Sequence, residues 1–114
     1  MDGGTAMFIS IRKYRNVRSV KEVRRRVEQE FIPMLRQNPG FQGYYLVDCN
    51  CPESGNVIRS ITMFDTWASV LDSNDRAKRW VRERLSDMLP EPAEAVGGEV
   101  ILNASKQRVF TTTA

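Results

Sequence analysis

The sequence predicts an α+β domain with the ferredoxin-like plan: a four-stranded antiparallel sheet, two helices on one face, and the element order βαββαβ. Three observations predict it. The chain has 114 residues, the size of a single domain. Two segments repeat apolar residues at helical spacing, and four shorter segments are rich in β-branched and aromatic residues. We expect residues 6–106 to form this one domain, with flexible ends or a strand extension at 1–5 and 107–114.

The first half of the chain contains a strand, a helix and a second strand. Ala6–Tyr14 alternates apolar and polar residues and predicts a strand. Val20–Arg36 predicts an amphipathic helix with Ser19 as its N-cap. Pro33 is expected to kink or end this helix near Ile32, because proline lacks an N–H group and clashes with the preceding turn. Phe41–Asp48 predicts the second strand. The apolar side of the helix consists of Val20, Val23, Val27, Phe31 and Leu35.

The second half repeats this order. Val57–Asp65 predicts the third strand, after a loop rich in turn-forming residues. Trp67–Met88 predicts the second helix, with either Asp65 or Thr66 as its N-cap. The segment "PEPAEAVGG" is expected to be a loop, and Glu99–Ser105 to be the last strand, with an extension through Val109 left open. One side of the second helix consists of Val70, Leu71, Asn74, Ala77, Val81, Leu85 and Met88.

Both faces of the predicted sheet contain apolar residues. A lone ferredoxin-like domain has helices on one face and water on the other, so its strands should alternate. Strands that are apolar on both faces are buried on both faces, and an exposed apolar face of that size exceeds what a monomer tolerates. We therefore expect a homodimer packed sheet to sheet. One parity holds Met7, Ile9, Ile11, Phe41, Tyr45, Val47, Ile61, Met63, Val100 and Leu102; the other holds Phe8, Tyr14, Tyr44, Leu46, Ile58, Phe64 and Ile101.

The composition limits the chemistry. Histidine is absent, which removes the commonest general base, the commonest metal ligand and the usual proximal haem ligand. Cys49 and Cys51 supply too few thiolates for a structural zinc site. We expect no metal and no cofactor, so that catalysis would depend on other side chains or on the substrate itself.

Charge and hydropathy bear on partners and location. The net charge of +3 comes from 17 basic and 14 acidic residues, and it indicates solvated helix faces more than a surface for nucleic acid. No apolar run approaches the ~20 residues that span a bilayer, and the first residues lack the signal-peptide pattern. We expect a cytoplasmic protein that binds neither membrane nor nucleic acid.

RNA-recognition motifs share the βαββαβ order, and the sequence argues against one. That motif stacks bases on aromatic residues of its third strand. Aligned from Arg59, the three aromatic positions hold Ile61, Met63 and Thr66, and a glycine position holds Ser60. Without stacking rings the apolar sheet face fits a dimer better.

Three polar residues are the candidate catalytic residues. Asn74 falls on the apolar side of the second helix, where an unpaired carboxamide would cost about 1–3 kcal/mol. It therefore makes either a structural hydrogen bond or a hydrogen bond to a ligand. Arg12 and Tyr14 share one parity of the first strand; an arginine can hold an enolate or carboxylate, and a tyrosine can donate a hydrogen bond.

Three aromatic residues are the candidate ligand-binding residues. Trp80 lies near the same side of the second helix as Asn74, and Trp67 begins that helix. Tyr44 lies in the second strand beside Tyr45. Each of them fits core or interface packing as well as a pocket for an aromatic ligand.

Four segments together resemble a known superfamily. "MFISIRKYRNV", "IPMLRQNPGFQGYYLVD", "SITMFDTWASVLDSNDRAKRWV" and "EPAEAVGGEVIL" are similar to small bacterial proteins of the dimeric α/β-barrel superfamily, which contains the antibiotic-biosynthesis monooxygenase domain. The resemblance covers residues 7–104. It implies the same fold and dimer, and a small-molecule cleft in each subunit between the helices and the sheet.

The resemblance leaves the activity open, because the superfamily includes several kinds of enzyme. Haem-degrading relatives use a helix histidine, which this chain lacks. Cofactor-free oxygenases use Asn and Trp near the start of the second helix; Trp67 and Asn74 are present, but their spacing and order do not match, and no role is transferred. Two functions are expected: a cofactor-free monooxygenase of a small aromatic or quinone-like molecule, or a non-catalytic dimeric ligand-binding or protein-interaction module.

Overall fold

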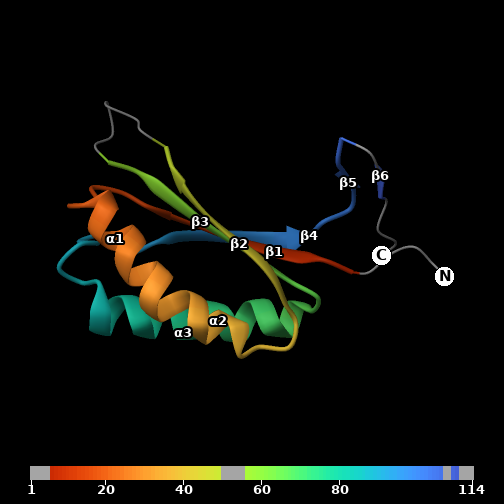
Figure 1. Cartoon of the computed structure of the whole chain (residues 1–114), viewed down its shortest axis with the longest axis horizontal. Coiled ribbons are helices and arrows are strands. Elements are labelled where there is room, and N and C mark those ends of the chain that lie inside the picture. The colour runs from red at the N-terminus through yellow and green to blue at the C-terminus, as the bar shows by residue number, and fades with distance from the viewer. Residues whose placement is uncertain (1–5, 50–55, 107–108, 111–114) are drawn as a thin grey trace.

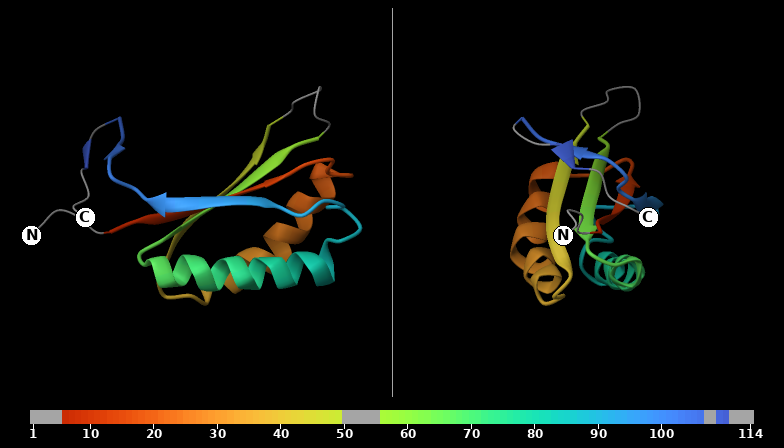
Figure 2. Two further views of the ribbon diagram at one scale, coloured as in Figure 1. Left: turned by 180° about the vertical axis from the view of Figure 1, so that it is seen from behind. Right: turned by 90° about the vertical axis from the view of Figure 1, so that its right-hand side faces the viewer.

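The computed structural model describes residues 6–49, 56–106 and 109–110. Its body is a four-stranded antiparallel sheet of order β2-β3-β1-β4, with the helices on one face (Figures 1 and 2). This confirms the predicted ferredoxin-like class. The strands are β1 (Phe8–Tyr14), β2 (Phe41–Asp48), β3 (Ile58–Phe64) and β4 (Glu94–Glu99), and the helical segments are α1 (Val20–Arg26), η1 (Val27–Phe31), α2 (Ile32–Arg36) and α3 (Trp67–Arg84).

The first helix accommodates Pro33 by widening before it. The segment η1 has π-helical geometry, in which the Ile32 N–H bonds to the Val27 carbonyl. Pro33 has no N–H to offer and crowds the carbonyl four residues earlier, and a π turn relieves that crowding. The helix does not end near Ile32, because α2 carries it on through Pro33 to Arg36, and the predicted apolar side remains continuous. Its buried members are Val23, Val27, Phe31 and Leu35.

The second helix begins as predicted and ends earlier. Thr66 is the N-cap of α3, and its hydroxyl accepts a hydrogen bond from the Ser69 N–H at 3.1 Å. The helix ends at Arg84, not at Met88, because Leu85 leaves the helical conformation. Leu71 is 51% exposed, so its predicted place on the buried side is wrong. The buried positions of the helix are Val70, Ser73 and Ala77.

The predicted last strand is also wrong. The fourth strand of the sheet, β4, comes from the segment expected to be a loop, and Glu99–Ser105 supplies only its final residue. β4 pairs with β1 and places Gly97 opposite Ser10. A Cβ at Gly97 would lie 2.7 Å from the Ile9 carbonyl oxygen, so glycine fits where bulkier strand formers do not.

Beyond β4 the chain leaves the sheet. Ile101 and Leu102 are 69% and 61% exposed. Two short strands, β5 (Asn103–Ala104) and β6 (Val109–Phe110), then pair with each other in a separate two-stranded sheet. Figure 1 shows them standing away from the body of the domain. The open extension of the last strand through Val109 is therefore not part of the main sheet.

The sheet has one covered and one open face. Pairing between β1 and β3 sets Ser10 opposite Thr62 and Arg12 opposite Ser60, and all four of these side chains are buried beneath the helices. The opposite parity faces away from the helices and is mainly apolar, with the charged residues Lys13, Arg59 and Glu94 together at one end. Its members include Ile9, Ile11, Tyr45, Val47, Ile61, Met63 and Val96.

The open face is accessible in a single chain. Tyr45 and Val96 are 62% and 65% exposed, and Val47 is 40% exposed.

None of the helices in the described ranges has the length and the apolar composition that a membrane-spanning helix needs.

Candidate functional site

A buried arginine lies at the centre of the candidate site. Arg12 belongs to the parity of β1 that faces the helices, and it is only 3% exposed. Among the described residues it is the only buried residue with a charged side chain. Its guanidinium lies 5.7 Å from the centroid of the Phe31 ring, within range of a cation–π contact. Burial of a charge requires compensating interactions, so its partners matter.

One branch of those partners leads to Asn74. Arg12 Nη1 donates to Asn74 Oδ1 at 2.9 Å, and Ser10 Oγ donates to the same oxygen at 2.7 Å. These two donors identify the oxygen of the carboxamide and occupy it. The amide nitrogen of Asn74 makes no hydrogen bond to any other described residue, so its two protons remain available. The carboxamide is thus both a structural acceptor and a free donor.

The other branch leads to Tyr44. Arg12 Nη2 donates to Ser60 Oγ at 3.4 Å, and Ser60 Oγ donates to the Tyr44 hydroxyl oxygen at 2.8 Å. Burial raises the pKa of Tyr44, so its hydroxyl stays protonated at neutral pH. We call these five residues the polar cluster: Ser10, Arg12, Tyr44, Ser60 and Asn74.

An open groove of about 380 Å³ reaches this cluster. α3 lines it with Asn74, Lys78 and Arg82, and the sheet lines it with Arg12 and Tyr14. The segment between α3 and β4 supplies the opposite wall, which is largely apolar. That segment contributes Leu89, Pro90, Glu91, Pro92 and Ala93, and Ala95 of β4 lies next to them in the lining. The three predicted catalytic residues therefore converge on one groove.

A small inner cavity lies on the other side of the same arginine. Its volume is about 20 Å³, room for one water-sized molecule. Tyr44, Phe31 and Trp80 line it together with Arg12. Trp80 stacks on Phe31 with ring centroids 5.1 Å apart, and its indole N–H donates to Glu30 at 3.3 Å. Trp80 and Tyr44 thus border the inner cavity, and Tyr14 lines both spaces.

Trp67 lies apart from the groove. It is 40% exposed and packs against Phe8, with ring centroids 6.2 Å apart, beneath the β4 backbone at Gly97. Its role as a ligand-binding residue stays a prediction, and its contacts are those of a residue that packs β4 onto the sheet. Cys49 is a free thiol, and Cys51 lies outside the described residues.

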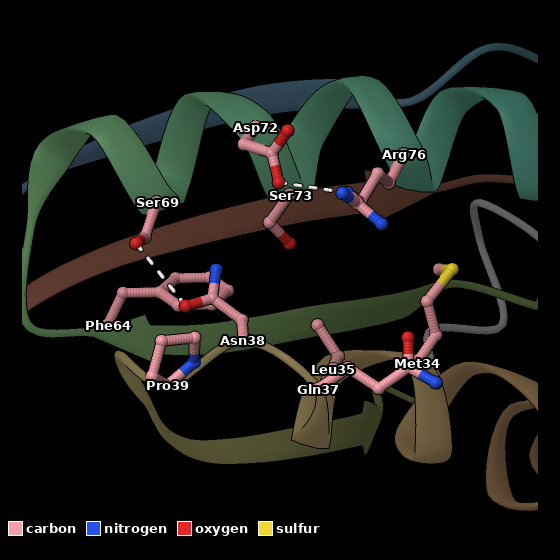
Figure 3. Close-up of a pocket in the computed structure, with 10 residues that line it drawn as sticks. All are labelled: Met34, Leu35, Gln37, Asn38, Pro39, Phe64, Ser69, Asp72, Ser73 and Arg76. Carbon is pink, nitrogen blue, oxygen red and sulfur yellow. Dashed lines mark hydrogen bonds and ion pairs between the residues drawn. The ribbon is translucent and has the colours of Figure 1, made fainter.

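A second pocket of about 460 Å³ opens on the far side of α3, between that helix and the end of α2. Figure 3 shows Ser73 pointing into it from α3, and Asn38 bonded to Ser69 at its edge. The Ser73 hydroxyl is buried and has no hydrogen-bond partner within the described residues. Arg76 on its rim pairs with Asp72 at 2.9 Å.

Ser10, Ser60, Lys78 and Arg82 are site residues that were not predicted from the sequence. The signal for the two serines is their spacing, because Ser10 and Ser60 fall on the parity of their strands that also holds Arg12 and Ile58. Lys78 follows Asn74 by one helical turn, and Arg82 follows Lys78 by another. Their exposed charges resemble an ordinary solvated helix face until the groove is seen.

No protein-family model matches the chain, and no curated protein matches its sequence. Solved structures do match. A monooxygenase of Streptomyces coelicolor, in complex with the ligand nanaomycin D, has TM-score 0.63 and 17% identity over 82% of this chain and 87% of that one. A proposed antibiotic biosynthesis monooxygenase of Bordetella bronchiseptica has TM-score 0.66 and 17% identity, over 85% and 99%.

A Nitrosomonas europaea protein of unknown function also matches, with TM-score 0.67 and 10% identity over 91% of this chain and 96% of that one. These matches confirm the predicted resemblance: the chain has the ferredoxin-like fold of the antibiotic-biosynthesis-monooxygenase-like proteins. At 10–17% identity they show the fold alone.

Proposed function

We propose that this protein is a cytoplasmic homodimer that binds a small aromatic or quinone-like molecule in the groove and oxidises it without metal or haem. The observation that supports this most directly is the meeting of Arg12, Asn74 and Tyr14 at an open, largely apolar groove. Apolar walls with a few convergent polar groups are the usual form of a small-molecule site. The fold shared with a monooxygenase solved with its ligand adds support.

The proposed reaction assigns a role to each residue. A substrate with an acidic ring C–H₂ group loses a proton to solvent water and forms a stabilised carbanion. The carbanion combines with dioxygen and takes a proton back from water to give a hydroperoxide. Loss of water from that hydroperoxide leaves a carbonyl, so that C–H₂ and O₂ become C=O and H₂O. Arg12 and the Asn74 amide protons stabilise the negative charge that develops on the ring oxygen. Tyr14 positions the substrate.

Tyr44 has a separate part in the proposal. Its hydroxyl stays protonated and faces the inner cavity beside Arg12. In that position it is a hydrogen-bond donor to whatever small molecule occupies the cavity, dioxygen or water. Trp80 and Phe31 form the apolar side of the cavity and keep the guanidinium dry.

The homodimer is proposed from the open face of the sheet. Tyr45, Val47 and Val96 are large apolar side chains with 62%, 40% and 65% exposure in the single chain. A second copy packed sheet to sheet would cover them without touching the polar cluster, which lies on the opposite face. The exposed Ile101 and Leu102 lie beyond the same sheet and would add apolar area to such a contact.

Oxygen consumption tests the enzymatic proposal. Chelator-treated protein is mixed with a panel of anthrones, which have an acidic ring C–H₂ group, and the oxygen uptake is compared with the buffer rate. We expect acceleration by the wild-type protein and a loss of about tenfold or more in kcat on Asn74→Ala, since one oxyanion donor contributes about that much or more. Full activity of Asn74→Ala would show that the role given to this carboxamide is wrong.

The second candidate is a non-catalytic dimer that binds a small ligand. It is favoured by one observation: the described residues of the groove include no acid–base pair, and Glu91, its one carboxylate, bonds to Asn16. Saturable binding of the same compounds without oxygen uptake would favour this candidate over the enzyme.

A further inference from the structure

Arg12 has no carboxylate partner among the described residues. Several arginines at the surface have a carboxylate at 2.5–2.9 Å, among them Arg15, Arg76 and Arg84. Arg12 is the most buried arginine of the described chain, yet its only hydrogen-bond partners there are the neutral Asn74 and Ser60. Its Nε atom is buried without any partner in that part of the chain. Arginine always keeps its charge, so the folded protein holds a cation that none of its described carboxylates neutralises.

The lining of the groove beside this cation also has a net positive charge. Of its charged lining residues, Arg12, Lys78 and Arg82 are basic and only Glu91 is acidic. Glu91 is already bonded to the side chain of Asn16. Lys78 and Arg82 are exposed and form no ion pair within the described ranges. The basic side chains of Arg82 and Lys78 therefore follow one another at intervals of one helical turn toward Asn74 and the buried guanidinium.

We propose that the ligand of this groove enters as an anion: a small aromatic molecule with a carboxylate that supplies the missing counter-charge to Arg12. This rests on the proposed function and deepens it, because a quinol is neutral when it binds whereas this ligand is charged before any reaction. The carboxylate accepts hydrogen bonds from the Arg12 guanidinium, and the free amide protons of Asn74 stay available to the ring oxygen of the proposed reaction. Lys78 and Arg82 attract it from solvent, and the walls of the groove contact its ring.

The geometry favours a carboxylate on an aromatic scaffold over a free inorganic anion. The wall between α3 and β4 is made mainly of proline, alanine and leucine side chains, which offer no hydrogen bonds to a phosphate or sulfate. A groove of about 380 Å³ is far larger than such an ion. An aromatic acid places one charged end at Arg12 and buries its ring against that wall.

Matched pairs of ligands test the charge alone. 2-Naphthoate and 2-naphthamide have the same shape, as have benzoate and benzamide, and each pair differs by one charge. We expect calorimetry to show that the wild-type protein binds each carboxylate at least about tenfold more tightly than its amide, since charge-assisted hydrogen bonds in a dry site are strong. Equal affinities within a pair would overturn the anion and leave the groove as a ligand site. Failure of all four compounds to bind at millimolar concentration would overturn the groove as an aromatic site as well.

Exchanging the amide of Asn74 for a carboxylate in the protein should abolish or reverse the preference for carboxylate ligands over amide ligands. Asn74→Asp is isosteric and gives Arg12 a carboxylate of its own, at the place where Oδ1 now lies 2.9 Å away. We expect the carboxylate-to-amide ratio to fall to one or below in this variant, while circular dichroism shows a folded protein. An unchanged preference in Asn74→Asp would show that the anion binds elsewhere.

A second set of variants distinguishes the contribution of the exposed groove residues Lys78 and Arg82 from that of the buried Arg12. Lys78→Gln combined with Arg82→Gln should weaken 2-naphthoate about two- to fivefold, the usual contribution of exposed charges, and the loss should vanish at high salt. Arg76→Gln is the matched control, because Arg76 lies on the far side of α3 beside the other pocket. A loss in the control as large as that in the rim variant would contradict the assignment to this groove.

Discussion

Replacement of Asn74 by aspartate should make the protein more stable, although it buries part of a new charge. The reason is the unneutralised Arg12, whose Nη1 lies 2.9 Å from the oxygen that the new carboxylate would inherit. Ser10 Oγ, at 2.7 Å from the same oxygen, would donate to the carboxylate as well. Hydrogen bonds between ionised partners are roughly twice as strong as neutral ones.

The magnitude follows from the pKa of the introduced aspartate. An arginine within hydrogen-bond distance lowers the pKa of an aspartate by about 1–3 units, and each unit corresponds to about 1.4 kcal/mol. Asn74 is half-buried, so desolvation of a carboxylate at its position offsets part of that gain. We expect a net stabilisation of about 1–2 kcal/mol, which raises Tm by roughly 5–10 °C in a domain of this size.

The pH dependence has a definite sign. The pKa of the introduced carboxyl would be lower in the folded state than its unfolded value of about 3.9. Its stabilisation is therefore fully present above pH ~4 and is lost as the pH falls through the folded pKa. Thermal unfolding of the variant and the wild type at pH 7 and at pH 2 measures both limits.

The control is Asn103→Asp, an exposed position on β5, where the same exchange should change stability by less than about 0.5 kcal/mol. If Asn74→Asp melts below the wild type at pH 7, Arg12 already has a counter-charge, and the inference of an unneutralised cation is refuted.

Three further predictions concern the dimer, the helix surface and the sheet. The double variant Tyr45→Asp and Val96→Asp changes two exposed positions of the open face and should halve the mass measured by light scattering, with an unchanged circular dichroism spectrum. The control Leu71→Asp, on the exposed side of α3, should leave the mass unchanged. A monomeric wild type would contradict the dimer. Hydrogen bonds from Arg25 and Arg26 lower the pKa of Glu22 to about 2, so the stability that they contribute is present above pH ~4.5 and is lost between there and pH ~2. Urea unfolding of Glu22→Gln should therefore be less sensitive to that acidification, and equal sensitivity would show that the pairs contribute nothing. Gly97→Ala sets a Cβ 2.7 Å from the Ile9 carbonyl oxygen and should destabilise the fold by about 1–3 kcal/mol, while Gly98→Ala, with nothing within 4 Å, should be nearly neutral; similar melting temperatures for the two variants would argue against the close packing of β4.

The parts of the fold that follow a local period were predictable. The first three strands and both helices begin within a residue or two of the expected positions, because their apolar residues repeat at 2 or 3.6 residues. β4 was not predictable in this way. Gly97 and Gly98 look like breakers, and the strand exists because its backbone pairs with β1, a contact far away in the sequence.

In the candidate site, too, some residues could be predicted from the local sequence pattern and others only from the pairing of the strands. Arg12, Asn74 and Tyr44 are conspicuous in the sequence because each is a polar or aromatic residue on an apolar stripe. Ser60 is an inconspicuous residue until the register of β1 and β3 sets it opposite Arg12. The parity that faces the helices is a property of the assembled sheet, and no single strand specifies it.

β1 encodes two surfaces in one heptapeptide. Its even-numbered residues from Ser10 onward lie beneath the helices, two of them in the polar cluster, and its odd-numbered residues belong to the open face. If the polar cluster binds the proposed ligand and the open face forms the proposed dimer, substitutions at residues 10 and 12 change the ligand and substitutions at residues 9 and 11 change the assembly, each independently of the other. An insertion or deletion of one residue within the strand is different in kind, because it exchanges the two sets and would destroy recognition and association together.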